Sequence, residues 1–403
     1  MFVIKRIPKK LGSLLAKEFF KRIKKRQIRI PLDTNSLSIN LVTSWDKQCG
    51  IATYSAFLAE ELKKNVQLYI TALPEKNALS PYFFIQGYEV ARSHDLVHVQ
   101  FEYGIFPSLR VGRKNLTAFA VLLFYFGLAL GNRHIITTIH EPRKKVTAGG
   151  KSGLYYTKLL DELIFTVSDL MIVHTRESRE IMKTTYGISE SKLQVIPHGS
   201  FEKPNYLNKE ECKRKLGLQN KTIITILGFV TPKKGHDLVI PLLSQLDPNV
   251  QLVIAGGPQT PNDAAYLERL KKIAAQYDCS DKVTFTGFLQ DLTCIINATD
   301  LAILPYRTVT DSGVLHLLIA YRVPTLASDL KAFTEVYDEF GCLELFNSED
   351  YRDLFEKIQV LLSNQQLRDL LKAKCEDMWN VTKWSSIAEK HLEIYQEVLA
   401  TRS

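Results

Sequence analysis

The sequence lacks several patterns that would assign it to a class at once. Its six cysteines form no CxxC pair and no Cys/His cluster, which predicts free thiols, a reducing compartment and no structural metal. No GxGxxG follows a candidate strand, so a dinucleotide fingerprint is missing. Basic residues interrupt every apolar run before residue 30, so we expect no secretory signal and a cytoplasmic protein.

The length and the composition predict two globular domains. A chain of 403 residues exceeds what one hydrophobic core organises, and 45% hydrophobic with 24% charged residues is an ordinary globular balance. The net charge of +9 is concentrated in residues 1–30, where eleven Lys and Arg face one acid, Glu18. The rest of the chain is close to neutral. This distribution favours attraction to an anionic surface over nucleic-acid binding, and we expect no nucleic-acid partner.

Residues 1–35 are predicted to form a basic amphipathic segment. Leucine, phenylalanine and isoleucine recur at helical spacing, and lysines occupy the other positions. The pattern favours docking on an anionic membrane surface, where each basic residue contributes about 1 kcal/mol. A solvated tail, or an extra helix packed on the body, stays open as the alternative.

From residue 36 onward, short apolar runs alternate with longer helical ones, which is typical of parallel α/β sheets. We expect an N-terminal Rossmann-like domain over 36–200, a polar linker over 201–220 and a C-terminal Rossmann-like domain with C-terminal helices over 221–403. The expected strands are 37–43, 66–73, 96–100, 134–140, 170–175 and 193–198, then 222–228, 250–256, 282–288, 301–306 and 323–329.

The segment 116–131 is free of charge over sixteen residues. It is shorter than the about 20 residues that span a bilayer, so a transmembrane helix is disfavoured. A buried core helix is the stronger interpretation, and a membrane-facing helix is the weaker one.

Three segments carry the features of phosphate sites. Gly50 precedes a helix start after the first strand, and Lys233 and Lys234 follow the first strand of the second domain. Ser312 opens an apolar helix that continues with Gly313, Val314 and Leu315. Helix N-termini offer free N–H groups and partial positive charge, and ammonium groups beside them suit a diphosphate. Gly50 alone is a weak signal, and a lysine pair is more often solvated.

The order of the segments resembles that of the family 4 glycosyltransferases, which have the GT-B fold. The resemblance covers about residues 37–400 and rests on ten short pieces, namely CGIATYS (49–55), TIHEP (138–142), VHTRES (173–178), VIPHGS (195–200), TPKKG (231–235), VIAGG (253–257), VTFTGFL (283–289), DLAILPY (300–306), SGVLHLLIAYRVPTLASD (312–329) and Glu335 in FTEV.

The resemblance implies two Rossmann-like domains facing one another across a cleft, with the nucleotide held by the C-terminal one. It implies glycosyl transfer from a nucleotide sugar with retention at the anomeric carbon, without a bound metal or another cofactor. The leaving nucleoside diphosphate gains negative charge, which Lys234 and the amides of 312–315 would stabilise in place of a divalent cation.

Carried over residue by residue, the resemblance places Gly50 under the donor phosphates and Lys234 on the diphosphate. His140 matches the histidine that positions the transferred hexose, so His140 and Lys234 are the predicted catalytic residues. Phe288 and Leu289 match the stretch that contacts the base. Glu102 follows another strand on the acceptor side, where an ion-paired loop acid is an equal alternative.

Two departures affect donor recognition. Phe229 stands where the family usually has a phosphate-binding arginine, so a cation is missing unless Lys233 or Arg307 substitutes. Val309 and Leu317 stand where the family usually has two glutamates separated by seven residues. The SGVL segment, with Asp311 beside it, takes the place of that motif.

The leading hypothesis is a hexosyltransferase that uses a donor such as GDP-mannose or UDP-glucose. Its expected acceptor is lipid-linked or a growing polysaccharide at the inner face of the membrane. A GT-B-like nucleotide-sugar epimerase and a non-catalytic nucleotide-sugar-binding protein stay open as alternatives, and a nicotinamide dehydrogenase is disfavoured by the missing fingerprint. The sequence leaves the donor base, sugar, acceptor, linkage and oligomeric state open.

Overall fold

The structure is a computed structural model, and it describes residues 37–45, 49–73, 80–107, 109–111, 114–116, 118–131, 133–142, 160–202 and 204–400. The chain divides into two compact units, of which the first comprises Met1–Pro197 with Ile387–Ser403 and the second comprises His198–Ser386. The basic segment expected over 1–35 lies outside the described residues.

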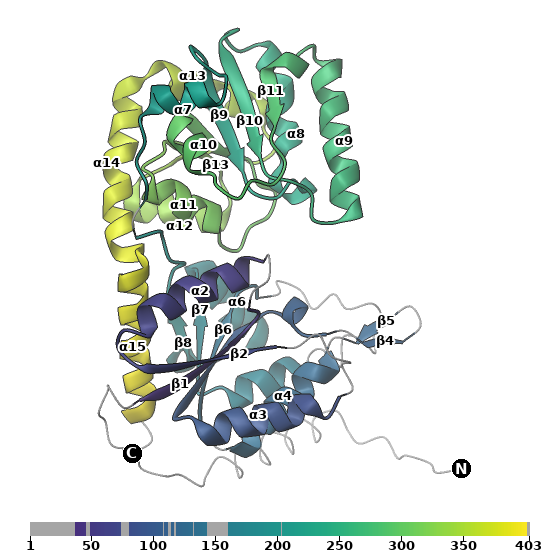
Figure 1. Cartoon of the computed structure of the whole chain (residues 1–403), viewed down its shortest axis with the longest axis vertical. Helices are drawn as coiled ribbons and strands as arrows, with labels where there is room; N and C mark the ends of the chain where they lie inside the picture. Colours follow the sequence, from purple (N-terminus) through teal and green to yellow (C-terminus); the bar gives the residue numbers. More distant parts are fainter. Residues whose placement is uncertain are drawn as a thin grey trace. The chain divides into compact units, whose positions relative to one another are not determined.

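The first unit is built on a parallel sheet of six strands in the order β2-β1-β3-β6-β7-β8 (Figure 1). The strands are Ser38–Thr43 (β1), Gln67–Ala72 (β2), Leu96–Phe101 (β3), His134–Ile139 (β6), Leu170–Val173 (β7) and Leu193–Val195 (β8). A separate antiparallel pair consists of Leu109–Val111 (β4) and Lys114–Leu116 (β5). Most of these strands are apolar along their whole length, because a parallel sheet is covered on both faces.

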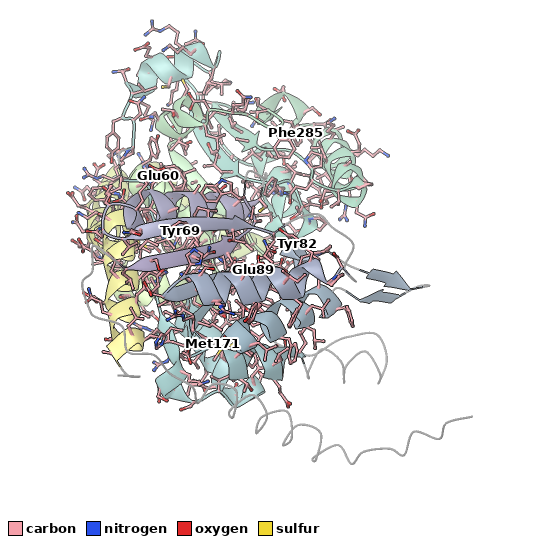
Figure 2. All side chains as sticks on the ribbon, turned by 60° about the horizontal axis from the view of Figure 1, so that its bottom comes forward. Glu60, Tyr69, Tyr82, Glu89, Met171 and Phe285 are labelled. Carbon is pink, nitrogen blue, oxygen red and sulfur yellow. The ribbon has the colours of Figure 1, made fainter. Side chains whose placement is uncertain are left out.

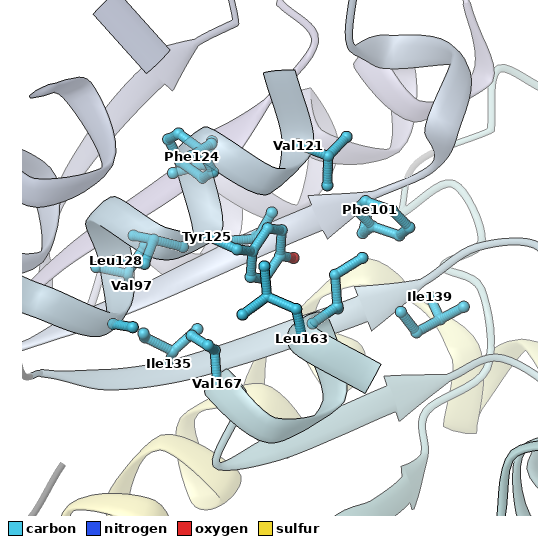
Figure 3. Close-up of a cluster of buried hydrophobic side chains, with 14 of the residues drawn as sticks. Val97, Phe101, Val121, Phe124, Tyr125, Leu128, Ile135, Ile139, Leu163 and Val167 are labelled. Carbon is cyan, nitrogen blue, oxygen red and sulfur yellow. The ribbon is translucent and has the colours of Figure 1, made fainter. Parts of the chain in front are cut away.

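The helical elements of the first unit follow its strands. They are Gly50–Leu62 (α2), Tyr82–Ser93 (α3), Tyr103–Ile105 (η2), Ala118–Gly131 (α4), helical residues 160–167, Arg176–Tyr186 (α6), Glu190–Lys192 (η3) and the C-terminal part of Trp384–Ala400 (α15). One face of the sheet packs against α4 and residues 160–167, where Tyr125 and Leu163 meet Val97 and Ile135 of the strands (Figure 3).

Helix α4 contains most of the uncharged segment 116–131, and it is a core helix as the stronger interpretation predicted. Phe124, Tyr125 and Leu128 are fully buried. Gly127 lies against the backbone of Phe84 in α3, so closely that a Cβ at this position would overlap the carbonyl oxygen of Phe84. None of the described helices is both long enough and apolar enough to cross a bilayer.

The edge strand β2 departs from the buried pattern of its neighbours. Tyr69 is 48% exposed, and Figure 2 shows it at the surface of the first unit, with Glu60 of α2 on one side and Glu89 of α3 on the other. An edge strand lacks a neighbour on one side, which accounts for the exposure.

The domain boundaries differ from the expected ones in two places. The units divide after Pro197, and the expected linker 201–220 lies within the second unit, where it contains Lys209–Lys215 (α7). Residues 387–400, expected in the C-terminal domain, belong to the first unit instead. The reason is burial: Ile387, His391 and Tyr395 are fully buried, and the Tyr395 hydroxyl lies 2.7 Å from Nδ1 of His98 in β3.

The second unit is also built on a parallel sheet of six strands, in the order β11-β10-β9-β12-β13-β14. The strands are Thr222–Leu227 (β9), Val250–Ala255 (β10), Val283–Phe285 (β11), Leu301–Leu304 (β12), Thr325–Ser328 (β13) and Glu344–Phe346 (β14). The helical elements besides α7 are Pro232–Lys234 (η4), His236–Val239 (α8), Ile240–Ser244 (η5), Pro261–Gln276 (α9), Ser280–Lys282 (η6), Thr293–Ala298 (α10), Gly313–Ala320 (α11), Lys331–Phe340 (α12), Tyr351–Ser363 (α13), Gln365–Thr382 (α14) and the start of α15.

Alternate residues of these strands build two separate cores, one on each face of the sheet. Ile224 and Ile226 of β9 belong to one apolar cluster, whereas Ile223 and Leu227 belong to the other. Successive side chains of a strand point to opposite faces, so each cluster takes every second residue. The expected doubly wound α/β architecture is confirmed in both units.

Strand order fixes where a ligand can bind in such a sheet. In the second unit the order reverses between β9 and β12, and in the first between β1 and β3. Ligands of open α/β sheets bind outside the carboxyl ends of the strands at this switch point. A ligand is therefore expected beside the segments after β9 and β12, and beside those after β1 and β3.

Candidate functional site

The loop after β9 places Lys234 at the switch point of the second unit. Its ammonium group lies 3.8 Å from the ring centroid of Tyr306, which follows β12, and it donates a hydrogen bond to the Tyr306 hydroxyl. Among the described residues no carboxylate lies within 4 Å of Lys234. Lys234 is thus a part-buried cation whose partner is a neutral aromatic ring, and its charge is not cancelled by an acid.

Helix α11 begins at the same point and leaves two backbone donors available. Ser312 is its N-cap: the hydroxyl accepts from the N–H of Leu315 at 3.2 Å, and its own N–H donates to Oδ1 of Asp311 at 2.7 Å. Among the residues that the structure describes, no acceptor faces the N–H groups of Gly313 and Val314. Of the four amides predicted to bind a diphosphate, these two remain able to do so.

Glycines bring the backbones of β9 and β10 close together beside Lys234. Gly256 has φ +154°, and a Cβ there would overlap the carbonyl oxygen of Gly228. A Cβ on Gly228 itself would lie 3.2 Å from Cγ2 of Val314 and 3.8 Å from Nζ of Lys234. Lys234 and the start of α11 therefore converge on Gly228. That they form a two-sided phosphate site stays a prediction.

An aromatic pair borders this region. The rings of Phe229 and Phe288 meet edge to face with centroids 5.8 Å apart, and the Phe288 ring covers Gly257. Phe288 is 58% exposed and Leu289 is 43% exposed, although both are large apolar side chains. Exposed aromatic surface next to convergent polar groups suits a nucleotide base.

Arg307 does not replace the missing arginine as a free cation. Its guanidinium holds both carboxylate oxygens of Asp237, at 2.8 and 3.2 Å, and Nε lies 2.6 Å from Glu349. The hydrogen bond to Asp237 raises the pKa of Arg307. Burial raises the pKa of Asp237, but hydrogen bonds from Arg307 and Tyr266 leave that pKa below its usual value. Lys233, the other suggested substitute, is exposed.

Arg307 has a structural task instead. Its backbone N–H donates to the carbonyl of Lys233 at 2.8 Å, and Nη1 donates to the carbonyl of Pro232 at 3.0 Å. These bonds fasten the Pro232–Lys234 turn that carries Lys234. The sequence alone did not distinguish this support from a phosphate contact.

In the first unit, Gly50 opens α2 beside the switch point. Cys49 is the N-cap, and its Sγ accepts from the N–H of Ala52 at 3.4 Å. A Cβ on Gly50 would meet nothing within 4 Å, and the residue has no positive φ. The local fold therefore does not require glycine at position 50. The close approach of a ligand would explain why a glycine stands there.

His140 follows β6 and is held by two side chains. Its Nε2 lies 2.8 Å from Oε1 of Gln100, and its Nδ1 lies 3.2 Å from Nε2 of His174. The ring of Tyr54 in α2 packs against both histidines, with centroid distances of 5.1 and 5.2 Å. His140 is therefore oriented by residues from three further elements.

Glu102 accepts a hydrogen bond from the backbone N–H of Gly104 at 2.6 Å. It thereby stabilises η2, the short turn after β3. The contact is a backbone hydrogen bond, so the acceptor role and the ion-paired loop acid both stay predictions for Glu102.

Sequence reasoning missed Tyr306, Gln100 and His174, although each lies in or beside a quoted segment. Their signal was position: Gln100 ends the apolar run 96–100, and Tyr306 and His174 follow strands in DLAILPY and VHTRES. Polar side chains at the carboxyl ends of parallel strands point to the ligand edge. The described residues contain no group of three or more His, Cys, Asp and Glu side chains that could hold a metal ion.

Comparison with known proteins shows what the chain resembles. Residues 208–377 match the family model of the glycosyl transferases, group 1. The second unit is thus similar to this family over most of its length. The chain superposes on the crystal structure of Anabaena HepE in complex with UDP with a TM-score of 0.74 at 14% identity, covering 90% of this chain and 100% of that one. The GT-B fold is thereby confirmed.

Two curated relatives illustrate the similarity. The chain is 24% identical over 353 residues to GDP-mannose:glycolipid 4-beta-D-mannosyltransferase from Xanthomonas campestris pv. campestris, covering 85% of this chain and 92% of the relative. It is 26% identical over 156 residues to mannosylfructose-phosphate synthase from Agrobacterium fabrum, and this match spans only 36% of the chain and 34% of that protein.

Proposed function

We propose that the protein transfers a hexose from a nucleotide-activated sugar to a lipid-linked or polysaccharide acceptor, with retention at the anomeric carbon. The observation that carries the proposal is the convergence of Lys234 with the available N–H groups of Gly313 and Val314 at the switch point of the second sheet. A cation without an acidic partner and two free backbone donors form a site suited to a diphosphate.

The chemistry follows from this electrostatic arrangement. When the bond from the anomeric carbon to the diphosphate oxygen breaks, the nucleoside diphosphate leaves with the electron pair and gains negative charge. Lys234 and the two amides stabilise that charge without a metal. The acceptor hydroxyl forms the new bond, and its proton passes to the departing phosphate. His140 positions the hexose.

The base is proposed to lie against the exposed Phe288, with Leu289 beside it. A relative with GDP-mannose in its name and a structure solved with UDP support a nucleotide donor without selecting the base. The name of the same relative specifies a glycolipid acceptor, which supports the acceptor class proposed here.

A thermal-shift panel of UDP-, GDP- and ADP-sugars tests donor binding, because a ligand that binds only the folded state raises the melting temperature. The bound donor is then incubated with glycolipid acceptors in the presence of EDTA. We expect a transferred hexose whose anomeric proton, observed by NMR, shows the configuration of the donor. An inverted product would overturn retention, and activity lost with EDTA would overturn metal independence.

A non-catalytic nucleotide-sugar-binding protein is the second candidate. It is favoured by Phe229 in the arginine position and by Arg307 being bound to two carboxylates. Donor binding with no transfer and no hydrolysis on prolonged incubation would support it. A sugar-nucleotide isomer formed without any acceptor would point to an epimerase instead.

We also propose that the enzyme binds the inner membrane surface peripherally, through residues 1–35. This rests on the net charge of +10 over residues 1–30. Removing residues 1–35 should release the protein from vesicles that contain anionic phospholipid and leave the thermal shift with the donor unchanged. Equal vesicle binding by the two forms would contradict this assignment.

A further inference from the structure

A continuous row of polar side chains runs through the buried face of the first sheet. It joins His174 to His140, His140 to Gln100, Gln100 to His98 and His98 to Tyr395 of α15. Gln100, His98 and Tyr395 are fully buried, and His174 is 5% exposed. The hydrogen atoms in this row can be assigned from the donor and acceptor properties of each neighbour.

The assignment begins at His174. Its Nδ1 lies 2.9 Å from the carbonyl oxygen of Ile196. A carbonyl oxygen only accepts, so Nδ1 of His174 carries hydrogen. Nε2 of His174 faces Nδ1 of His140 at 3.2 Å, and one proton between these two nitrogens makes their hydrogen bond.

The other nitrogen of His140 requires a further proton. Nε2 of His140 lies 2.8 Å from Oε1 of Gln100, which also only accepts. With this orientation of the Gln100 amide, the four ring nitrogens of His140 and His174 hold three protons. Two neutral imidazole rings hold two, so this arrangement gives the pair one positive charge.

The far end of Gln100 allows this orientation of its amide. Nε2 of His98 lies 3.3 Å from Nε2 of Gln100 and 2.7 Å from Oγ1 of Thr138, and Nδ1 of that ring lies 2.7 Å from the Tyr395 hydroxyl. Burial lowers the pKa of His98 well below its usual value, so this ring is neutral. In the tautomer with hydrogen on Nδ1, that N–H donates to Tyr395, and Nε2 accepts from Gln100 and from the Thr138 hydroxyl.

We infer that Gln100 is a positioning residue: its side-chain oxygen holds a proton on Nε2 of His140, so that His140 and His174 together carry one positive charge. The ring of Tyr54 packs against the pair, with its centroid 5.1 and 5.2 Å from those of the two histidines.

Other ionisable groups surround the pair. The elements that pack around it contribute Cys49 and Tyr54 at α2, His98 and Glu102 at β3, Glu141 after β6, Arg176 and Glu177 at the start of α6, and His391 and Tyr395 on α15. His98 and His391 are both neutral at pH 7, because burial lowers the pKa of each. Neither of these two rings therefore takes the positive charge that is assigned to His140 and His174.

Nitrogen-15 NMR of protein labelled at its histidines tests the proton count without any substrate. Signals of His140 and His174 are assigned from the variants His140→Gln and His174→Gln. At pH 7 the wild-type protein should show three protonated nitrogens in the pair. Two protonated nitrogens, with an N–H of Gln100 facing His140, would overturn the inference.

Two substitutions of Gln100 should move the titration of the pair in opposite directions. Gln100→Glu places a carboxylate beside the cation and should raise the midpoint by about one pH unit or more. Gln100→Leu removes the acceptor and should lower it. Gln194→Glu, an exposed position of β8, adds the same charge and should leave the midpoint unchanged. Equal midpoints in all four proteins would contradict the assignment.

The kinetic consequence rests on the proposed function. If the cation serves transfer, kcat should fall as the pH rises through the midpoint of the pair, and Gln100→Glu should move that limb to higher pH. A purely structural role of Gln100 would lower kcat at every pH and leave the limb in place, which would contradict the positioning role. Failure of every sugar nucleotide to bind would overturn the proposed function, whereas the NMR result would still decide the proton count.

Discussion

The ammonium group of Lys234 lies over the ring of Tyr306, so that the loop after β9 and the segment after β12 are joined at the point where the strand order reverses. This contact holds the cation in place and leaves its charge uncompensated. Cation–π contacts contribute about 0.5–2 kcal/mol, less than a buried ion pair would cost to break. The lysine can therefore turn from the ring to a ligand.

Lys234→Ala should weaken the binding of nucleoside diphosphates roughly 10- to 100-fold, because a hydrogen bond to a charged group contributes about 1.5–3 kcal/mol. Isothermal titration calorimetry with UDP and GDP measures the change. Lys233→Ala removes the same charge from the exposed neighbouring residue and should change the dissociation constant by less than about threefold. Equal losses in both variants would indicate general charge attraction instead of a defined contact.

Gly50→Val should leave the stability of the protein nearly unchanged and weaken donor binding. A Cβ at this position meets no atom of the described residues within 4 Å, so the added side chain projects away from them. Thermal unfolding with and without the donor separates the two effects. If the variant binds the donor as well as the wild type does, Gly50 does not lie under the phosphates.

Gly256→Ala should behave in the opposite way and destabilise the second unit by about 2–4 kcal/mol. Its positive φ disfavours a side chain, and a Cβ would overlap the Gly228 carbonyl oxygen. Urea unfolding followed by circular dichroism measures the loss. Gly50→Ala is the matched control, and similar midpoints for the two alanine variants would refute the close backbone contact.

His391 should make the first unit sensitive to acid. Burial lowers its pKa to about 4, so the folded state holds the neutral ring while the unfolded state takes up a proton below about pH 6.5. The unfolded state binds more protons in this window, so stability is complete above pH 6.5 and is lost as the pH falls towards 4, by up to about 1.4 kcal/mol per pH unit.

The variant His391→Gln tests this pH dependence. Unfolding free energies measured between pH 8 and pH 4.5 should decline less steeply in the variant than in the wild type. The difference at pH 8 gives the effect of altered packing alone. Parallel curves over the whole range would show that His391 does not contribute.

Most strands could be predicted from the sequence, because buried parallel strands appear as apolar runs between helical segments. β14 was missed, since Glu344 interrupts the short apolar run around it. The antiparallel pair β4 and β5 was missed because Arg110 and Lys114 interrupt the apolar pattern there. β14 and its register are defined by pairing with β13 in the folded sheet.

Sequence position brought Lys234 and the start of α11 together as candidates, because each follows a strand of the second sheet. The structure places both beside Gly228, and their binding of a phosphate stays a prediction. The ion pairs of Arg307 with Asp237 and Glu349 could not be predicted, since these residues are far apart in sequence. The same holds for Tyr395, which reaches His98 across 297 positions.

The return of residues 387–400 to the first unit affects how the chain folds during synthesis. The first sheet leaves the ribosome early, but Ile387, His391 and Tyr395 are translated only after the whole second unit. At about 5–20 residues per second, roughly 10–40 s separate the two events. During that interval the nascent sheet exposes an incomplete apolar face, which makes it a natural client for a chaperone.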